Sequence, residues 1–500
     1  MKVNASQYSI KFLTLIEIVS KLMIFWLSVV VAKNFGGNEH IDIFTWTVFF
    51  IINFQGWLFG TFSFTVIPIL GNMTLNRKKT AIRSLIWLVI CTAIFSISLL
   101  APFYENLFHL MTKFSEEVIH SFSIGFKLMC LYFLTNSLFE VIEIKFNERK
   151  SFIIPAILRG IVNPAILIIV ILYFSLSEIE EYALIYFLGN FVAFIILALK
   201  DYLDEKQKPK SKQFIDYGFY KSLFLRGYPI FLGQLINSIG EFLLRFFLTG
   251  SSIGTLFFYS IAKKLADAIN SLFIQTIVKI GFVEISQISI SENNFRNNTY
   301  GLMIKSVYFF CVFASSFLLI ISETLVTSFY TGGDITPANT QLIVDIFQIL
   351  IIGLIPHSLG AFNWKVLSYL DATKIGMYLG LPLSIVTGYS YYKASTILGL
   401  AYAEVIMAFL HTFIYGTYTI KKLGFKITQR DIIFIIFTPI LCFLSADMID
   451  SITSLFLDSK GVIYLFTIIA FSIPTLYVVA NLMKKITPFA FSDLKRLNPY

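Results

Sequence analysis

Long apolar segments separated by short polar connections follow one another along almost the whole chain. Each is close to the roughly 20 residues that an α-helix needs to cross the hydrocarbon core of a bilayer. The pattern predicts an all-α polytopic membrane protein with about 14 transmembrane helices. We place them near 9–33, 43–70, 83–103, 119–144, 152–174, 181–200, 226–249, 255–283, 303–328, 340–364, 375–392, 397–420, 431–449 and 461–483.

The longest charged connection, residues 201–225, divides these spans into two sets. It is charged and contains one proline, which is typical of a linker or surface helix. Six spans precede it, and the next six start with the same orientation, so we predict two pseudo-symmetric six-helix lobes, as in transporters built from parallel repeats. The predicted parts are an N-lobe (1–200), the linker, a C-lobe (226–422) and two further helices with a tail (423–500).

The distribution of basic residues predicts the orientation of these helices. If the chain crosses the membrane at every span, 28 Lys and Arg residues fall on the side that holds both termini, and four fall on the other side. Cytoplasmic loops carry the excess of Lys and Arg. We therefore expect both termini to be cytoplasmic, in a bacterial cytoplasmic (inner) membrane. The first span lacks a small-residue cleavage site, so we expect it to stay in the membrane.

Composition excludes several classes of function. A mean hydropathy of +0.77 and only 14% charged residues exclude a soluble globular protein. The net charge of +9 lies mostly on one membrane side, which favours contact with membrane lipids over nucleic acid. No GxxxxGK[ST], HExxH or GxSxG motif occurs, and the Cys and His residues show no metal-ligand spacing. We predict a transporter without catalytic residues, metal or cofactor, apart from Na+ or H+ as a coupling ion.

Two acid–base pairs lie inside spans that are otherwise apolar: Glu17 with Lys21, and Glu241 with Arg245. A charge at the middle of a bilayer costs about 2.5–3.5 kcal/mol, so it usually faces a partner or a water-filled cavity. These pairs therefore predict a polar cavity inside a transporter. For the first pair two interpretations stay open: Glu17 neutralises Lys21 as a structural pair, or Lys21 is a cation of the cavity.

The seventh span carries a polar stripe that extends its charged pair. Gln234, Asn237, Ser238, Glu241 and Arg245 have the spacing of a single helical face. Such a face can be a hydrogen-bonded seam between helices or the lining of a cavity. Because two charges are included, we favour a cavity lining.

The eighth span contains the adjacent cations Lys263 and Lys264, followed by Asp267. Lys263 and Asp267 are four residues apart and are expected to neutralise each other. Lys264 then becomes the cation that we expect to bind an anion. The alternative is that Lys264 extends to the membrane surface, although it lies about ten residues inside the span.

Single charged residues in other spans have weaker interpretations. Glu404 in span twelve is a candidate carboxylate for the coupling ion, and Arg159 in span five is either a cavity cation or extends to the interface. Glu140 and Glu143 are expected to be solvated at the end of span four. Asp42 is expected to cap the N-terminus of the second span.

Several motifs in this order resemble the MviN/MurJ-type lipid II flippase family. The family's motifs are Ser-Arg, Ala-Arg, Phe-Gly and Asp-Ala-Phe, then Gly-Ala-Phe-Ser with a later Pro, and Ala-Asp-Arg-Leu. In this chain they read Ser20-Lys21, Ala32-Lys33, Phe35-Gly36, Asp42-Ile43-Phe44, Gly60-Thr61-Phe62-Ser63 with Pro68, and Ala262-Lys263-Lys264-Leu265. The segment Ser368–Lys374 is similar to the family's loop after span ten. The resemblance covers essentially the whole chain.

The resemblance implies a flippase that moves a polyprenyl-diphosphate-linked saccharide by alternating access. Lys21, Lys264 and Arg245 would hold the diphosphate, supported by Glu17, Glu241 and Asp267. The family's further cavity arginines are absent at Leu27 and near Phe54–Gln55. The expected substrate is therefore lipid II or a surface-polysaccharide repeat unit, with glycosyltransferases or a polymerase as partners. The alternative is an ion-coupled multidrug exporter of the same superfamily, whose cationic substrates would need more acids in the cavity.

Overall fold

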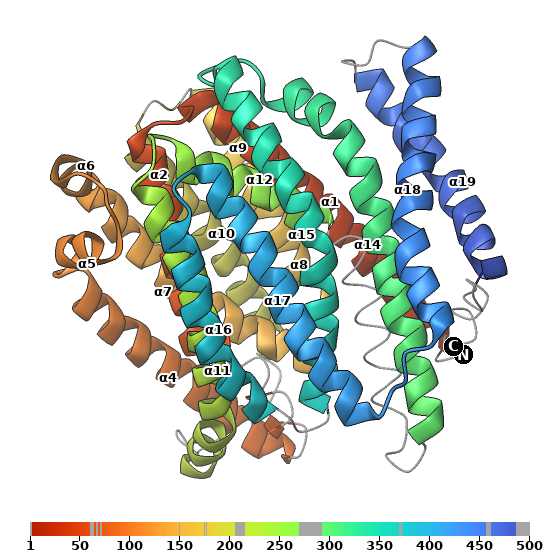
Figure 1. Cartoon of the computed structure of the whole chain (residues 1–500). Coiled ribbons are helices and arrows are strands. Elements are labelled where there is room, and N and C mark those ends of the chain that lie inside the picture. The colour runs from red at the N-terminus through yellow and green to blue at the C-terminus, as the bar shows by residue number, and fades with distance from the viewer. Residues whose placement is uncertain are drawn as a thin grey trace. The chain divides into compact units, whose positions relative to one another are not determined.

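The computed structural model describes residues 3–60, 65–66, 69–70, 73–149, 151–174, 176, 178–205, 216–269, 293–369, 373–456 and 462–486. Apart from one isolated bridge between Gly332 and Ile335, the regular structure of these residues is helical (Figure 1). Twelve helices within the described ranges are long and apolar enough to cross a membrane. This confirms the prediction of an all-α polytopic membrane protein.

The two remaining predicted spans also coincide with helices. One is α12 (Thr255–Ile269), whose described part ends within the predicted span 255–283, and the other is α16 (Thr373–Lys393). The chain groups into two compact units, Met1–Phe257 with Gly376–Gly388, and Phe258–Ile375 with Tyr389–Tyr500.

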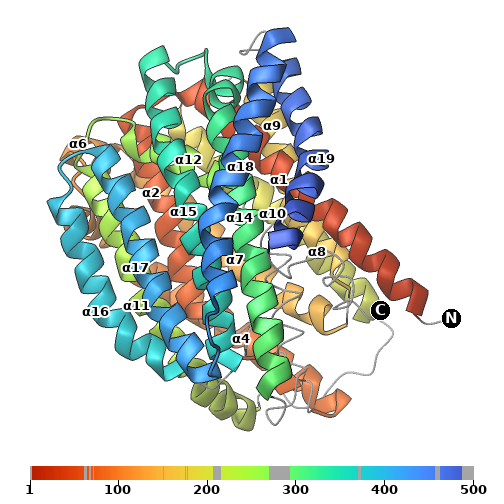
Figure 2. The same cartoon turned by 45° about the vertical axis from the view of Figure 1, so that its right-hand side comes forward.

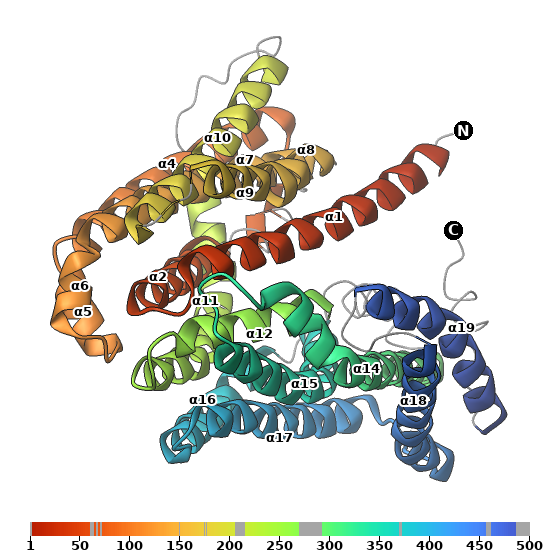
Figure 3. The ribbon, with the colours of Figure 1, turned by 90° about the horizontal axis from the view of Figure 1, so that it is seen from above.

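The first unit is built from the helices of the first half of the chain. They are α1 (Val3–Phe35), α2 (Glu39–Gln55), η1 (Gly56–Gly60), α4 (Leu75–Leu100), α5 (Tyr104–Met111), α6 (Glu116–Ser121), α7 (Ser123–Glu148), α8 (Ile153–Ile157), η2 (Leu158–Val162), α9 (Asn163–Phe174), α10 (Ile179–Glu205) and α11 (Tyr217–Thr249). Helix α7 packs against α2, α4 and α10, and α10 also packs against α9 (Figure 3). The middle of α16 joins this unit, where Ser384 Oγ donates to the carbonyl of Ile236 on α11 at 3.1 Å.

Two transmembrane segments of this unit contain one π-helical turn each, η1 and η2, which the hydrophobic pattern did not predict. Such turns re-aim side chains and are frequent at functional sites. Gly160 in η2 lies directly against Ser20 on α1, and a Cβ at Gly160 would come within 2.3 Å of Ser20 Oγ. Glycine is therefore required for the close approach of α1, next to Lys21.

Helix α11 begins at a defined polar contact. Asp216 precedes its first residue and accepts a hydrogen bond from the backbone N–H of Phe219 at 3.0 Å. Arg77 of α4 donates to Asp216 Oδ2 at 2.8 Å, and this hydrogen bond holds the pKa of the Asp216 carboxyl below its ordinary value. The residues that precede the polar stripe of span seven are thereby fixed to α4.

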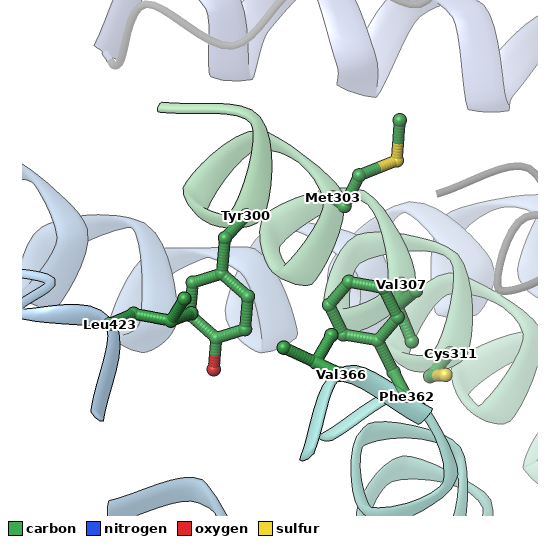
Figure 4. Packing of buried hydrophobic residues seen from close by; sticks show 7 residues of the cluster. All are labelled: Tyr300, Met303, Val307, Cys311, Phe362, Val366 and Leu423. Atoms are coloured by element: carbon green, nitrogen blue, oxygen red, sulfur yellow. The ribbon is translucent and has the colours of Figure 1, made fainter. Parts of the chain in front are cut away.

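The second unit contains α14 (Asn293–Tyr330), α15 (Pro337–Tyr369), α17 (Ile397–Leu423), α18 (Gln429–Phe456) and α19 (Val462–Ile486), together with most of α12. Helix α15 packs between α14 and α17, and α18 lies against both α14 and α19 (Figure 2). One fully buried cluster connects α14, α15 and the end of α17 (Figure 4). Its members are Tyr300, Met303, Val307, Cys311, Phe362, Val366 and Leu423. This apolar packing connects α14 and the C-terminal part of α15 with the C-terminal end of α17.

Candidate functional site

A buried charged cluster joins three helices of the second unit. Glu404 of α17, whose side chain is 7% exposed, is its centre. Lys263 Nζ of α12 donates to Glu404 Oε1 at 2.9 Å, and Tyr259 Oη donates to Oε2. His357 of α15 places Nε2 3.9 Å from the same Oε1. Because Tyr259 and Lys263 are four residues apart, both reach Glu404 from one face of α12.

This arrangement adds to what the sequence indicated. The spacing rule predicts Asp267, on the same helix, as a partner of Lys263, and the structure adds Glu404, which is 141 residues away in the sequence. The structure also brings His357 and Tyr259 to this carboxylate, two residues for which the sequence indicated no charged partner. The signal that could have found Tyr259 is its position one turn before Lys263 on an otherwise apolar face.

The next residue on α12, Lys264, has a different environment. Successive residues of a helix are about 100° apart around the axis, so Lys264 does not share the face that meets Glu404. Its side chain is exposed, as is that of Asp267. Helix α12 therefore has one lysine that contacts a buried acid and a second whose side chain is exposed.

In the first unit Arg245 lies in an aromatic environment. Its guanidinium carbon is 3.5 Å from the centroid of the Phe49 ring, and its NH1 is 3.4 Å from Glu241 Oε2. The side chain of Arg245 is 13% exposed, whereas that of Glu241 is 48% exposed. A guanidinium over an aromatic face is held by a cation–π interaction. The predicted pair therefore forms, but its cation is mostly covered.

The rest of the polar stripe on α11 contacts the π-helical turn η1. Trp57 Nε1 donates to Ser238 Oγ at 2.8 Å, and Ser238 Oγ donates to the carbonyl of Gln234. The side-chain oxygen of Gln234 is buried and accepts no hydrogen bond from the described residues. The side chain of Asn237 lies outside the part of the chain that the structure describes. The stripe thus combines a hydrogen-bonded seam with one buried acceptor.

Glu17 and Lys21 lie on α1, where Glu17 is exposed and Lys21 is half-buried. Lys21 remains a candidate cation next to the close contact between Ser20 and Gly160.

Arg159 organises a polar network that the sequence interpretation had left as separate residues. Its two terminal nitrogens lie 3.2 Å from Glu143 Oε2 and 3.7 Å from Glu140 Oε1. Arg159 also donates to Asn136 Oδ1 at 3.5 Å, and Asn136 donates to Gln55 Oε1 at 2.8 Å. The side chain of Arg159 is 43% exposed. Glu140 and Glu143, which were expected to be solvated, therefore also contact the guanidinium of Arg159.

Asp42 has a different role from the predicted one. The second span is capped by Asn38, whose Oδ1 accepts from the backbone N–H of Ile41 at 2.8 Å. The carboxylate of Asp42 instead accepts from the N–H groups of Gly254 at 2.8 Å and Phe257 at 2.7 Å. The prediction that Asp42 caps its own helix is therefore wrong. It satisfies the first N–H groups of α12, because an N-terminus can be capped by any acceptor that reaches it.

The turn before α12 depends on Gly254. Its φ is +80°, and a Cβ there would lie 2.6 Å from the carbonyl oxygen of Gly37. We expect Gly254→Ala to destabilise the protein by about 2 kcal/mol or more, since both the left-handed backbone and the clash act on backbone atoms.

The measurement is the melting temperature of the detergent-solubilised protein. Gly56→Ala is the matched control, because a Cβ at Gly56 meets nothing within 4 Å and its backbone is right-handed helical. Equal melting temperatures for the two variants would contradict the role given to Gly254.

The chain matches known proteins over most of its length. The family model "Lipid II flippase MurJ" matches residues 31–471. A protein of Borreliella burgdorferi named "Probable lipid II flippase MurJ" is 24% identical over 443 residues, covering 84% of this chain and 85% of that protein.

Solved structures share the fold. One described as "Lipid II flippase MurJ, inward closed conformation" matches with a TM-score of 0.77 and 15% identity, over 95% of this chain and 99% of that chain. A multidrug resistance MATE family transporter of the MOP superfamily, in an inward-facing conformation, matches with a TM-score of 0.66 and 14% identity, over 82% and 98% of the respective chains. At these identities the structural matches show the fold alone.

Proposed function

The chain belongs to the lipid II flippase MurJ family, and from this premise we propose that it is a flippase for a polyprenyl-diphosphate-linked saccharide. The precursor would be lipid II or a surface-polysaccharide repeat unit. It would move from the cytoplasmic to the external leaflet of a bacterial cytoplasmic membrane by alternating access, with both termini of the protein in the cytoplasm. The enzymes that make or use this lipid, glycosyltransferases or a polymerase, are the expected partners.

The observation that supports this function most is the exposed Lys264 on α12, beside a Lys263 that Glu404 already neutralises. A cation inside a membrane-spanning bundle is costly unless it serves a ligand or a partner. A diphosphate suits such a site because it is a compact anion that a lysine ammonium binds as a point charge. Lys264 is thus proposed as a direct ligand of the diphosphate.

The other cations have graded roles in this proposal. Lys21 is half-buried and is a second direct ligand. Arg245 is 13% exposed and stacked on Phe49, so it contributes positive potential rather than a direct contact. Arg159 brings a half-exposed guanidinium into the network of Gln55, near the position where the family has an arginine. It thereby supplies a cation from a different span.

Energy would come from the membrane potential or from an ion gradient, since the sequence has no phosphate-binding loop for ATP. Each elementary charge that crosses the membrane gains about 2.3 kcal/mol per 100 mV. A net positive set of cations that returns to the cytoplasmic side after release of the lipid could use this potential. Glu17, Glu241 and Asp267 would keep the cations charged and hydrated between cycles.

Growth of cells depleted of their own lipid II flippase tests this function. We expect expression of the chain to restore growth if lipid II is its substrate. If the substrate is a surface-polysaccharide unit, growth is not restored, but surface polysaccharide returns in cells that lack its flippase. Resistance to cationic drugs without either effect would favour the multidrug exporter and contradict the proposal.

A further inference from the structure

The cluster around Glu404 has two bases for one carboxylate oxygen. Lys263 Nζ is 2.9 Å from Oε1 and His357 Nε2 is 3.9 Å from the same atom, while Tyr259 occupies Oε2. We propose that this cluster binds a proton and exchanges the partner of Glu404. When His357 is protonated, its Nε2 donates to Glu404 Oε1 in place of Lys263. The ammonium of Lys263 then adds its charge to that of Lys264. The inference rests on the proposed function for its role in transport but not for its chemistry.

The state in which Lys263 contacts Oε1 of Glu404 and the state in which His357 does so differ by a small movement. A hydrogen bond between nitrogen and oxygen has a length of about 2.9 Å, so the imidazole needs to move by only about 1 Å to make one. Gly353, one turn before His357, allows α15 to pack closely on α17 here, because a Cβ at Gly353 would lie 3.1 Å from Val405 Cγ2, whereas it would make only an ordinary contact with the imidazole at 3.5 Å. Pro356 immediately precedes His357 and removes one helix hydrogen bond, which makes α15 easier to adjust locally.

Exposure decides where the proton enters. The side chain of His357 is 47% exposed, that of Lys263 is 21% exposed, and that of Glu404 is 7% exposed. Of the three side chains, the imidazole is therefore the least covered by protein, and we propose it as the group that takes up the proton. Histidine is also the side chain that ordinarily changes charge between pH 5 and 8.

The donor set suits a proton better than a sodium ion. Hard cations take several oxygen ligands, supplied by carboxylates, hydroxyls and free backbone carbonyls. Here a lysine ammonium already lies against Glu404, the second neighbour is an imidazole, and α17 is a continuous helix at this point. A sodium ion would have to displace the ammonium, whereas a proton binds to a nitrogen that is already present.

The surroundings contain few competing charges. Of the helices packed against α15, α14 has no Asp, Glu, Lys, Arg or His between Lys305 and Glu323. It contributes Cys311 and the hydroxyl of Tyr308. On α17 the titratable groups besides Glu404 near this level are Tyr402 and His411, and on α12 they are Tyr259, Lys263, Lys264 and Asp267.

The exchange keeps charge and atoms balanced. When His357 is neutral, the charges of Lys263 and Glu404 cancel. When His357 is protonated, the cluster carries one additional positive charge. The only covalent bond that changes is the N–H bond of the imidazole. The extra charge appears beside Lys264, the proposed ligand of the diphosphate. Binding of an anion and binding of a proton would therefore favour each other, as required for coupled sites.

Nuclear magnetic resonance of ¹³C,¹⁵N-histidine-labelled protein in lipid nanodiscs tests the exchange directly, since the chain has only five histidines. The His357 signal, assigned by its loss in His357→Gln, is expected to titrate between pH 5 and 8. In Lys263→Met the midpoint should rise by about one pH unit or more, because Glu404 is then no longer shared. In His411→Gln, the matched control two turns along α17, it should stay unchanged.

A His357 midpoint that does not move in Lys263→Met, or that lies outside this pH range in the wild type, would overturn the inference. If Lys263→Met does not fold, Glu404→Gln together with Lys263→Met is the second variant, and there the midpoint should fall back toward that of a free histidine. The role in transport is read separately in proteoliposomes with a fluorescent lipid II analogue. There the pH dependence of translocation should disappear in His357→Gln, and its persistence would overturn the role in coupling. A wild type that titrates but moves no lipid would contradict the proposed function alone.

Discussion

Lys264→Ala is expected to slow translocation of a polyprenyl-diphosphate-linked saccharide by roughly 10- to 100-fold. The physical reason is the loss of a charge-assisted hydrogen bond, worth about 1.5–3 kcal/mol, at an accessible cation beside a neutralised Lys263. Lys264→Arg should keep most of the rate, because a guanidinium pairs well with phosphate oxygens. The measurement is lipid translocation in proteoliposomes that contain equal amounts of inserted protein.

Lys393→Ala is the matched control for this experiment. Lys393 is also a lysine of a transmembrane helix, but it is the last residue of α16, and the structure places its ammonium over the rings of Tyr389 and Tyr392. Its removal should leave the translocation rate unchanged. A normal rate in Lys264→Ala, with correct folding and insertion, would remove Lys264 from the proposed binding site.

Glu404→Gln is expected to have the largest effect on stability, about 3–5 kcal/mol. Glutamine preserves the shape of the side chain but leaves the charge of Lys263 without its carboxylate inside the bundle. Removing one partner of a buried ion pair costs much more than replacing both with neutral groups. The double variant Lys263→Met with Glu404→Gln should therefore recover most of the lost stability.

Thermal unfolding of the single and double variants in the same detergent measures this coupling as a double-mutant cycle. Tyr402→Phe serves as a control on the same helix, since the Tyr402 side chain is 54% exposed and lies outside the cluster. Additive losses in the two single variants and the double variant would show that Lys263 and Glu404 do not stabilise each other.

The transmembrane helices could be predicted from the sequence because the bilayer imposes a length and an apolar composition on each of them. The π-helical turns at Gly56–Gly60 and Leu158–Val162 could not be predicted, since apolar length and composition do not distinguish a π-helical turn from an α-helical turn within a span. Their effect is visible only in their contacts, such as that of Trp57 with Ser238.

In the candidate site, the sequence predicted contacts within one helix better than contacts between helices. Spacing along one helix correctly paired Glu241 with Arg245. It did not find Glu404 as the partner of Lys263, because that acid is 141 residues away. For Asp42, the rule that a polar residue caps the nearest helix start gave the wrong helix, because Asn38 already caps α2. Charged residues inside the spans were therefore identified, but their partners on other helices were not.

The most direct test of the proposed flippase is the protein-dependent movement of a fluorescent polyprenyl-diphosphate saccharide across a liposome membrane. Its exposure is followed by quenching with a reductant that cannot cross the bilayer, and the same saccharide on a polyprenyl monophosphate is the comparison. We predict rapid quenching of the second leaflet for the diphosphate lipid and little for the monophosphate lipid. Equal rates for the two lipids, or no movement of the diphosphate lipid, would contradict the proposal that intramembrane lysines carry a diphosphate.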